Sequence, residues 1–350
     1  MMDAGLAQFH LLLIDEDTGP GDVVTLVHTL LPHASAAEDG GLRLSRHSTL
    51  LGPLPISAAD AGALGVRGAG TVFALRSPVE RETEPPPDWM SSRDGLEKAF
   101  PAGLPNRDEG RYFGLLVDVA RRLGATIRVA DDASSPARPG WASGGVKLLT
   151  PDPEDAVNLT VYSTYWLTPE TLLPVVQHTL PGAELQAGLA EWEGPASGVV
   201  DDPADPVVRD ELTIEERTRL HADADQFDAE AMAGDPELEG YGITALLPGS
   251  AGDVDPENPP GGYIEILVRV EEEPVPALSG VDRAGMDLVA YEVRWMDSLS
   301  QRFVGDRSPE FDSERRASRR YVERVAVGVV EATSGVIVDE FGFLVDRYHL

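Results

Sequence analysis

The sequence predicts a mixed α+β fold that is built from two similar halves. Two observations support this prediction. First, a strand followed by a helix occurs near the start of each half, with the strand at 9–14 in the first half and at 157–162 in the second. Second, an apolar helix followed by an extended segment closes each half, within 110–130 and 319–345. Internal similarity of this kind is typical of a repeated structural unit.

The opening segments match each other residue by residue near their helices. Their helices end at 27–32 and 177–181, and four positions match without a gap: Thr18, His28, Thr29 and Leu30 align with Thr168, His178, Thr179 and Leu180. A histidine near a helix C-terminus interacts favourably with the helix dipole and with the last carbonyl groups. We therefore expect a structural role for His28 and His178 in preference to a catalytic one.

The closing segments carry apolar residues at helical spacing. The stripe of the first half is Tyr112, Leu115, Leu116, Val119 and Leu123, and that of the second is Val322, Val325, Ala326 and Val329. Extended segments follow at 126–129 in the first half and at 336–338 and 343–345 in the second. Each half is thus expected to end in a helix and at least one strand.

Between these ends the sequence predicts strands at 70–75 in the first half and at 240–247, 263–270 and 288–295 in the second. The resulting order, βαββαβ, is that of a ferredoxin-like unit, so we predict a tandem duplication of this unit. The repeat restarts just after Asp155, which divides the chain into a first half at 1–155 and a second half at 156–350. The second half is expected to contain an acidic helical insertion at about 200–238.

Composition limits the possible environments and partners. The 350 residues include 42% hydrophobic side chains and no cysteine, so the chain can fold without disulfides or cysteine-bound metals. The net charge of -32 disfavours nucleic acid and would attract a basic protein partner. Residues 1–13 lack the basic region of a signal peptide and no segment reaches the length of a membrane span, so a cytoplasmic location is expected.

One helix carries a possible metal site. In the helix that follows Thr213, His221, Asp225 and Asp228 share a face, where one imidazole and two carboxylates could bind a divalent cation. Further ligands would have to come from elsewhere, and a solvated acidic face explains the same residues. The acids at 253–257 lack the glycine and the final glutamate of a calcium loop.

Arginines are concentrated at the start of the last helix. They are Arg315, Arg316, Arg319, Arg320 and Arg324, of which Arg316, Arg320 and Arg324 share one face. Cations at a helix N-terminus oppose the helix dipole, so a compensating anion is expected. Glu314, Glu323 or the helix that carries Asp225 could supply it, and the alternative is an external anion or an acidic partner.

The sequence lacks the local motifs of several enzyme classes. It contains no phosphate-binding loop, no dinucleotide fingerprint, no HExxH and no nucleophile elbow. The sequence therefore favours a non-catalytic binding or regulatory protein without a cofactor. Two alternatives stay open: a metal-assisted hydrolase that uses His221, Asp225 and Asp228, and an acidic inhibitor or immunity-type protein that binds a basic partner. The pattern specifies neither a ligand nor an oligomeric state.

Overall fold

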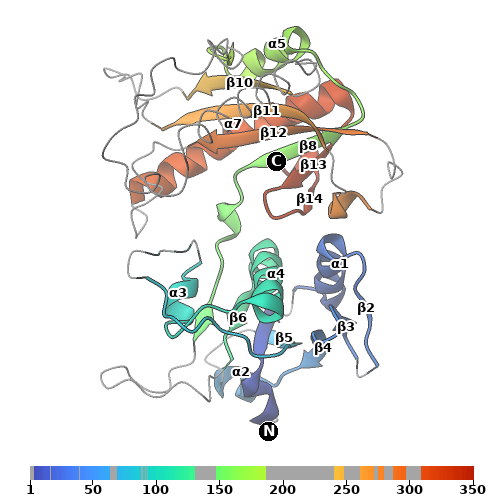
Figure 1. The fold of residues 1–350 in the computed structure, drawn as a ribbon, viewed down its shortest axis with the longest axis vertical. Coiled ribbons are helices and arrows are strands. Elements are labelled where there is room, and N and C mark those ends of the chain that lie inside the picture. Colours follow the sequence, from blue (N-terminus) through green and yellow to red (C-terminus); the bar gives the residue numbers. More distant parts are fainter. Residues whose placement is uncertain are drawn as a thin grey trace, which may run out of the picture.

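The computed structural model shows an α+β fold with two antiparallel sheets of seven strands each (Figure 1). The α+β class predicted from the sequence is therefore confirmed. Among the residues that the structure describes, no helix is long and apolar enough to cross a membrane. The described residues are 4–15, 17–38, 40–63, 69–87, 90, 92, 94–130, 147–186, 240–247, 261–271, 275–279, 287–296 and 309–350.

The first sheet has the strand order β2-β3-β4-β5-β1-β6-β7. Its strands are β1 (His10–Asp15), β2 (Ser35–Ala36), β3 (Leu42–Arg43), β4 (Thr49–Pro55), β5 (Ala69–Arg76), β6 (Thr126–Arg128) and β7 (Leu148–Leu149). The helical elements of this part are η1 (Ala4–Gln8), α1 (Pro20–Leu30), α2 (Ala58–Ala63), α3 (Leu96–Ala99), α4 (Arg107–Leu123) and η2 (Pro153–Asp155). Sequence reasoning missed β4, because Gly52 and Pro53 interrupt its apolar run; the sheet accommodates them with a register shift between Leu51 and Leu54.

The second sheet has the strand order β14-β13-β8-β12-β11-β10-β9. Its strands are β8 (Leu159–Ser163), β9 (Glu184–Leu185), β10 (Tyr241–Leu246), β11 (Tyr263–Glu271), β12 (Leu288–Met296), β13 (Val336–Asp339) and β14 (Leu344–Val345). The helical elements are α5 (Pro169–Thr179), η3 (Pro276–Leu278), α7 (Pro309–Thr333) and η4 (Arg347–His349). The predicted acidic insertion at about 200–238 lies outside the described residues.

The two sheets share one strand order when the second is read from β9 to β14. Their registers agree as well. Leu12 of β1 lies between Phe73 of β5 and Ile127 of β6. Val161 of β8 lies in the same way between Tyr291 of β12 and Ile337 of β13. The opening strands 9–14 and 157–162 thus occupy equivalent places in their sheets.

The ferredoxin-like plan is not confirmed. In the split βαβ arrangement of that plan, a third strand lies between the two parallel strands that a helix connects, so neighbouring strands are antiparallel. The antiparallel pairing of β1 with both of its neighbours therefore does not contradict that plan. The difference lies in the number of strands: β2 and β3 follow α1, β9 and β10 follow α5, and a further short strand, β7 or β14, follows β6 or β13.

The helix register corrects the gapless match of the sequence segments. Both α1 and α5 begin with a proline, and their capping residues Leu31 and Leu180 donate N–H groups to the carbonyls of Val27 and Val176. We compare the residue numbers of corresponding positions in the two halves. The number increases by the same amount from Leu31 to Leu180 as from Leu12 to Val161, but from His28 to His178 it increases by one more. The counterpart of His178 is therefore Thr29, and the recurrence of histidine is not a paired site. Each histidine does lie in the last turn of its helix, as expected for a structural role.

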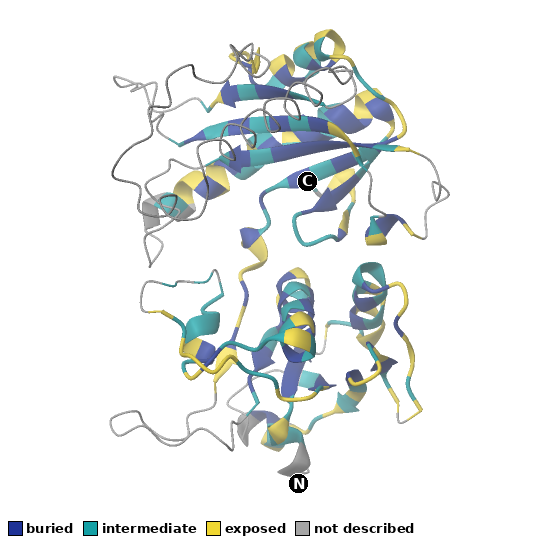
Figure 2. Ribbon diagram, in the orientation of Figure 1, coloured by how far each residue is buried: buried dark blue, intermediate teal, exposed yellow. Residues whose placement is uncertain are grey.

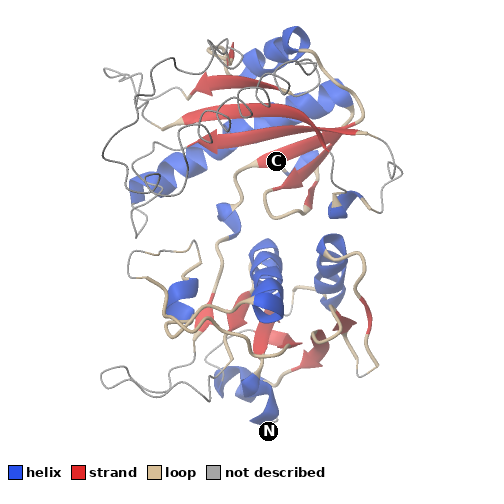
Figure 3. Cartoon of the chain, in the orientation of Figure 1, coloured by secondary structure: helices blue, strands red, loops and turns tan. Residues whose placement is uncertain are grey.

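Helices cover one face of each sheet, and the main cores lie beneath them (Figure 3). Buried residues line the strands and the inner sides of α4 and α7 (Figure 2). Of the predicted helical stripes, Leu123 is partly buried against the core and the other members are all buried: Tyr112, Leu115, Leu116, Val119, Val322, Val325, Ala326 and Val329. On the other face of the first sheet, η1 and the segment that leads into α2 contribute Leu6, Phe9 and Ile56 to a smaller apolar cluster.

Contacts also join the two sheet-bearing parts. The turn between β13 and β14 reaches α1 and α4 of the first part (Figure 1). Phe343 of this turn is 1% exposed and belongs to the core cluster of the first part. Gly342 has a φ of +85°, and a Cβ atom there would lie 2.9 Å from Leu30 Cδ2. Only glycine fits this conformation and this close approach without strain.

Candidate functional site

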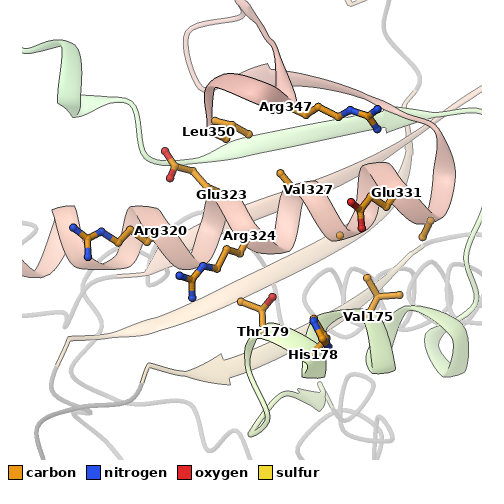
Figure 4. A pocket seen from close by; sticks show the side chains of 12 residues that line it. Val175, His178, Thr179, Arg320, Glu323, Arg324, Val327, Glu331, Arg347 and Leu350 are labelled. Atoms are coloured by element: carbon orange, nitrogen blue, oxygen red, sulfur yellow. The ribbon is translucent and has the colours of Figure 1, made fainter.

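An open groove of about 960 Å³ runs along the solvent side of α7, beside the end of α5 (Figure 4). We call it the α5/α7 groove. In Figure 4, α7 forms its floor, the last turn of α5 forms one side, and Arg347 and Leu350 stand on the other. The lining residues are Val175, His178, Thr179, Arg320, Glu323, Arg324, Val327, Gly328, Glu331, Ala332, Arg347 and Leu350.

The helical repeat of α7 explains why arginine reaches this groove. The apolar stripe that contains Val325 and Val329 faces the core, and Arg320 and Arg324 lie on another side of the helix, where they are exposed. Arg320 and Arg324 are four residues apart, which places them on one side of the helix about 6 Å apart along its axis. Arg324 extends toward Thr179 at the end of α5 (Figure 4).

Close approach of the two helices shapes the floor. A Cβ atom on Gly328 would lie 3.2 Å from Val175 Cγ1, so the glycine lets α5 pack tightly against α7. Val327 and Ala332 add apolar surface on α7, and His178 is exposed on α5. The groove therefore combines an apolar floor with cationic side chains at the end nearer the start of α7.

Some arginines of α7 pair with acids that the structure describes, and others do not. Arg315 is buried and bonds Asp155 through its Nη1, and Arg319 Nε donates to Glu323 Oε1 at 2.7 Å. Compensation by the protein's own acids is thus present for these two residues. Arg316, Arg320 and Arg324 are exposed and form no ion pair with another described residue. Of these three, Arg320 and Arg324 line the groove and Arg316 does not.

The predicted metal residues His221, Asp225 and Asp228 lie outside the described residues, as do the acids at 253–257. Within the part of the chain that the structure describes, no group of three or more histidine, aspartate or glutamate side chains is placed to hold a metal ion.

A buried polar cluster in the first half was not visible in the sequence. His10 Nε2 lies 2.9 Å from Glu109 Oε1, and the Ala130 N–H lies 3.1 Å from His10 Nδ1. Arg81 donates two hydrogen bonds to the same carboxylate, at 2.8 and 2.5 Å, and the Glu80 N–H donates a third at 2.7 Å. Because His10 and Glu109 are far apart in the chain, no local motif could have indicated their contact.

The environment fixes the charge states of this cluster. Burial lowers the pKa of His10, although Glu109 opposes this effect. Burial by itself would raise the pKa of Glu109, but hydrogen bonds from His10 and Arg81 together hold it below its ordinary value. Glu109 is thus a carboxylate and His10 a neutral imidazole that donates from Nε2. Their hydrogen bonds are used up within the cluster, which favours a structural role.

A second buried network lies where the two halves meet. Arg121 Nη2 donates to both oxygens of Asp94, at 2.8 and 2.7 Å, and its Nη1 is 3.4 Å from Asp155 Oδ2. Asp155 also binds Arg315, whose Nη2 lies 3.7 Å from Glu340 Oε1. Since these charges come from both halves and bond one another, they hold the connecting segment in place.

Family models, curated proteins and solved structures gave no significant match. The function therefore has to be argued from the geometry of this chain alone.

Proposed function

We propose that the protein is a non-catalytic binding or regulatory protein that holds an acidic partner in the α5/α7 groove. The observation that carries this proposal is that Arg320 and Arg324, on the groove side of α7, form no ion pair within the described part of the chain. The chain carries 60 acidic against 28 basic residues, so acidic residues were plentiful as partners for these cations. Neighbouring guanidinium groups that have no such partner among the described residues suit recognition of carboxylates from outside.

The polar groups of the first half support a binding role over catalysis. His10 and Glu109 are the residue types of acid–base catalysis, but they bond each other, Arg81 and backbone groups inside the protein. A catalytic acid or base needs a free position from which it can reach a substrate.

We further propose that the chain arose by duplication of one α+β unit, with the boundary near Asp155. The shared strand order and the constant step in residue number from β1 and α1 to β8 and α5 support this history. An Asp-capped turn also follows the last strand of each unit, at η2 and at η4. Duplicated units often keep the fold while their surfaces diverge, so a binding surface on one unit needs no copy on the other.

Binding of a labelled hexaglutamate peptide to the full chain tests the proposed groove. We expect salt-sensitive binding in fluorescence anisotropy, with an affinity about 10- to 150-fold lower for Arg324→Ala, since a lost charge-assisted hydrogen bond costs about 1.5–3 kcal/mol. Arg46→Ala removes one exposed arginine from the first half and serves as the matched control. Equal affinities of the two variants, or no binding by the native chain, would refute the proposal.

A further inference from the structure

The α5/α7 groove has a counterpart in the first half. Ile127 and Ile337 occupy equivalent positions beside β1 and β8. The helices α4 and α7, which precede these strands, align with the same difference in residue number as Ile127 and Ile337. This alignment also matches the buried Leu116 with Ala326, and Gly124 with Ser334, both of which have a positive φ. Three groove residues of the second half therefore have known counterparts: Glu331, Ala332 and Thr179 correspond to Arg121, Arg122 and Leu30.

In the first half these counterparts are covered by a turn. The Arg121 guanidinium lies 4.4 Å from the centre of the Phe341 ring, and Arg122 Nη2 donates to the Leu344 carbonyl at 3.1 Å. Leu30 packs against Gly342. The α1/α4 surface thus holds the turn Asp339–Leu344, which connects β13 with β14.

The equivalent surface of the second half carries no such turn among the described residues. Glu331, Ala332 and His178 are exposed, and no described segment lies over them. The chemistry has also changed, because Gly110 and Gly114 of α4 are the counterparts of Arg320 and Arg324. The floor keeps apolar residues, Val175 and Val327. A segment docked here would meet cations at two positions where the first half has glycine.

We infer that the α5/α7 groove docks a tight turn of a partner protein, with apolar side chains at the turn and carboxylates beside them. This inference rests on the proposed function and names the partner more closely. The covered surface of the first half indicates the shape of the occupant, a turn between two short strands. The charges of Arg320 and Arg324 indicate that it is acidic, and Val175 and Val327 that it carries apolar groups.

A cyclised peptide with the sequence of residues 337–345 is a suitable probe. It forms the same kind of turn and carries two carboxylates, two phenylalanines and further aliphatic side chains next to them. The full chain is titrated with this peptide, with hexaglutamate and with inorganic phosphate. We expect the cyclic peptide to bind at least tenfold more tightly than hexaglutamate, and phosphate not to compete at millimolar concentration.

Two variants locate the binding. Ala332→Trp fills the groove from an exposed position and should abolish binding of the cyclic peptide. Ala317→Trp places the same side chain at an exposed position of α7 that does not line the groove, one turn before Arg320, and should leave binding in place. Far-UV circular dichroism checks that both variants fold. Binding that survives Ala332→Trp would overturn the inference, because the peptide would then occupy another surface such as that of α1 and α4.

The outcomes separate the two proposals. Equal affinity for the cyclic peptide and hexaglutamate, both weakened by Arg324→Ala, would refute the docked turn and leave an acidic partner in place. Competition by inorganic phosphate would have the same meaning. Absence of binding by all probes would refute both. Sedimentation of the native chain as a dimer that Ala332→Trp dissociates would make a second copy the occupant and overturn the inferred partner.

Discussion

Replacement of Glu109 by alanine should destabilise the first half strongly. The side chain is buried, with 1% of the residue exposed, and it takes part in four hydrogen bonds between 2.5 and 2.9 Å. Those bonds connect β1 to α4 through His10 and connect the segment after β5 to α4 through Arg81. Alanine removes the only carboxylate among these three side chains.

The size of the effect follows from what is left behind. Arg81 keeps a guanidinium whose side chain is only 21% exposed, and His10 keeps a buried N–H group without an acceptor. Removal of one member of a buried ion pair costs about 3–5 kcal/mol. For a domain-sized unit, this corresponds to a decrease of about 6–20 °C in the melting temperature.

Calorimetry of the full chain measures this loss. Glu314→Ala removes an exposed glutamate from α7 and should change stability by less than about 0.5 kcal/mol. A double-mutant cycle with Arg81→Ala isolates the pair, and we expect a coupling energy of about 1.5–3 kcal/mol.

A loss below about 1 kcal/mol for Glu109→Ala would contradict the structural role. An increase in melting temperature would contradict it more directly, since groups kept for catalysis or binding often reduce stability and their removal then raises it. The cluster would in that case be a functional site.

Three further predictions concern pH and the contact between the halves. Burial lowers the pKa of His10 from 6.5, so as the pH falls the imidazole takes up a proton in the unfolded chain before it does so in the folded chain. The neutral His10 therefore contributes its full stability above about pH 6.5. This stability decreases as the pH falls toward the pKa of the folded state, by at most about 1.4 kcal/mol per pH unit. Urea midpoints at pH 7.5 and 5.5 should therefore differ less for His10→Asn than for the native chain. Gly342→Ala should loosen the contact of the turn with Leu30 and speed proteolysis of the connecting segment at 150–158. Gly40 has a similar φ of +88° but open space around it, so Gly40→Ala is the control and should not change the rate. Equal cleavage rates of the two variants would refute this prediction. Asp155→Asn leaves the buried Arg121 and Arg315 without their shared carboxylate and should cost about 3–5 kcal/mol in calorimetry, and a loss within about 0.5 kcal/mol would contradict that network.

The strand and helix segments could be predicted because their signals are local. The apolar run of β1, the alternating residues of β11 and the stripes of α4 and α7 each lie within one short window of sequence. Burial of one helix face or one strand requires that spacing wherever the element lies in the fold.

Strand pairing was decided by tertiary structure. The order of the segments is compatible with parallel or antiparallel neighbours, and the antiparallel contacts of β1 depend on β5 and β6, which are both distant from it in the sequence. The repeat register was also misjudged by one position, because identical side chains at the helix ends outweighed the buried positions. Only the pairing of Leu12 and Val161 with their neighbours fixed the correct spacing.

The sequence by itself determined the composition, the charge and which residues of α7 share a face. It could not decide which arginines would be paired. Asp155 and Arg315 bond each other although 160 residues separate them in the chain, whereas Arg320 and Arg324 line the groove. Charge pairing and groove formation depend on distances between elements, and chain folding sets those distances only when both cores are packed.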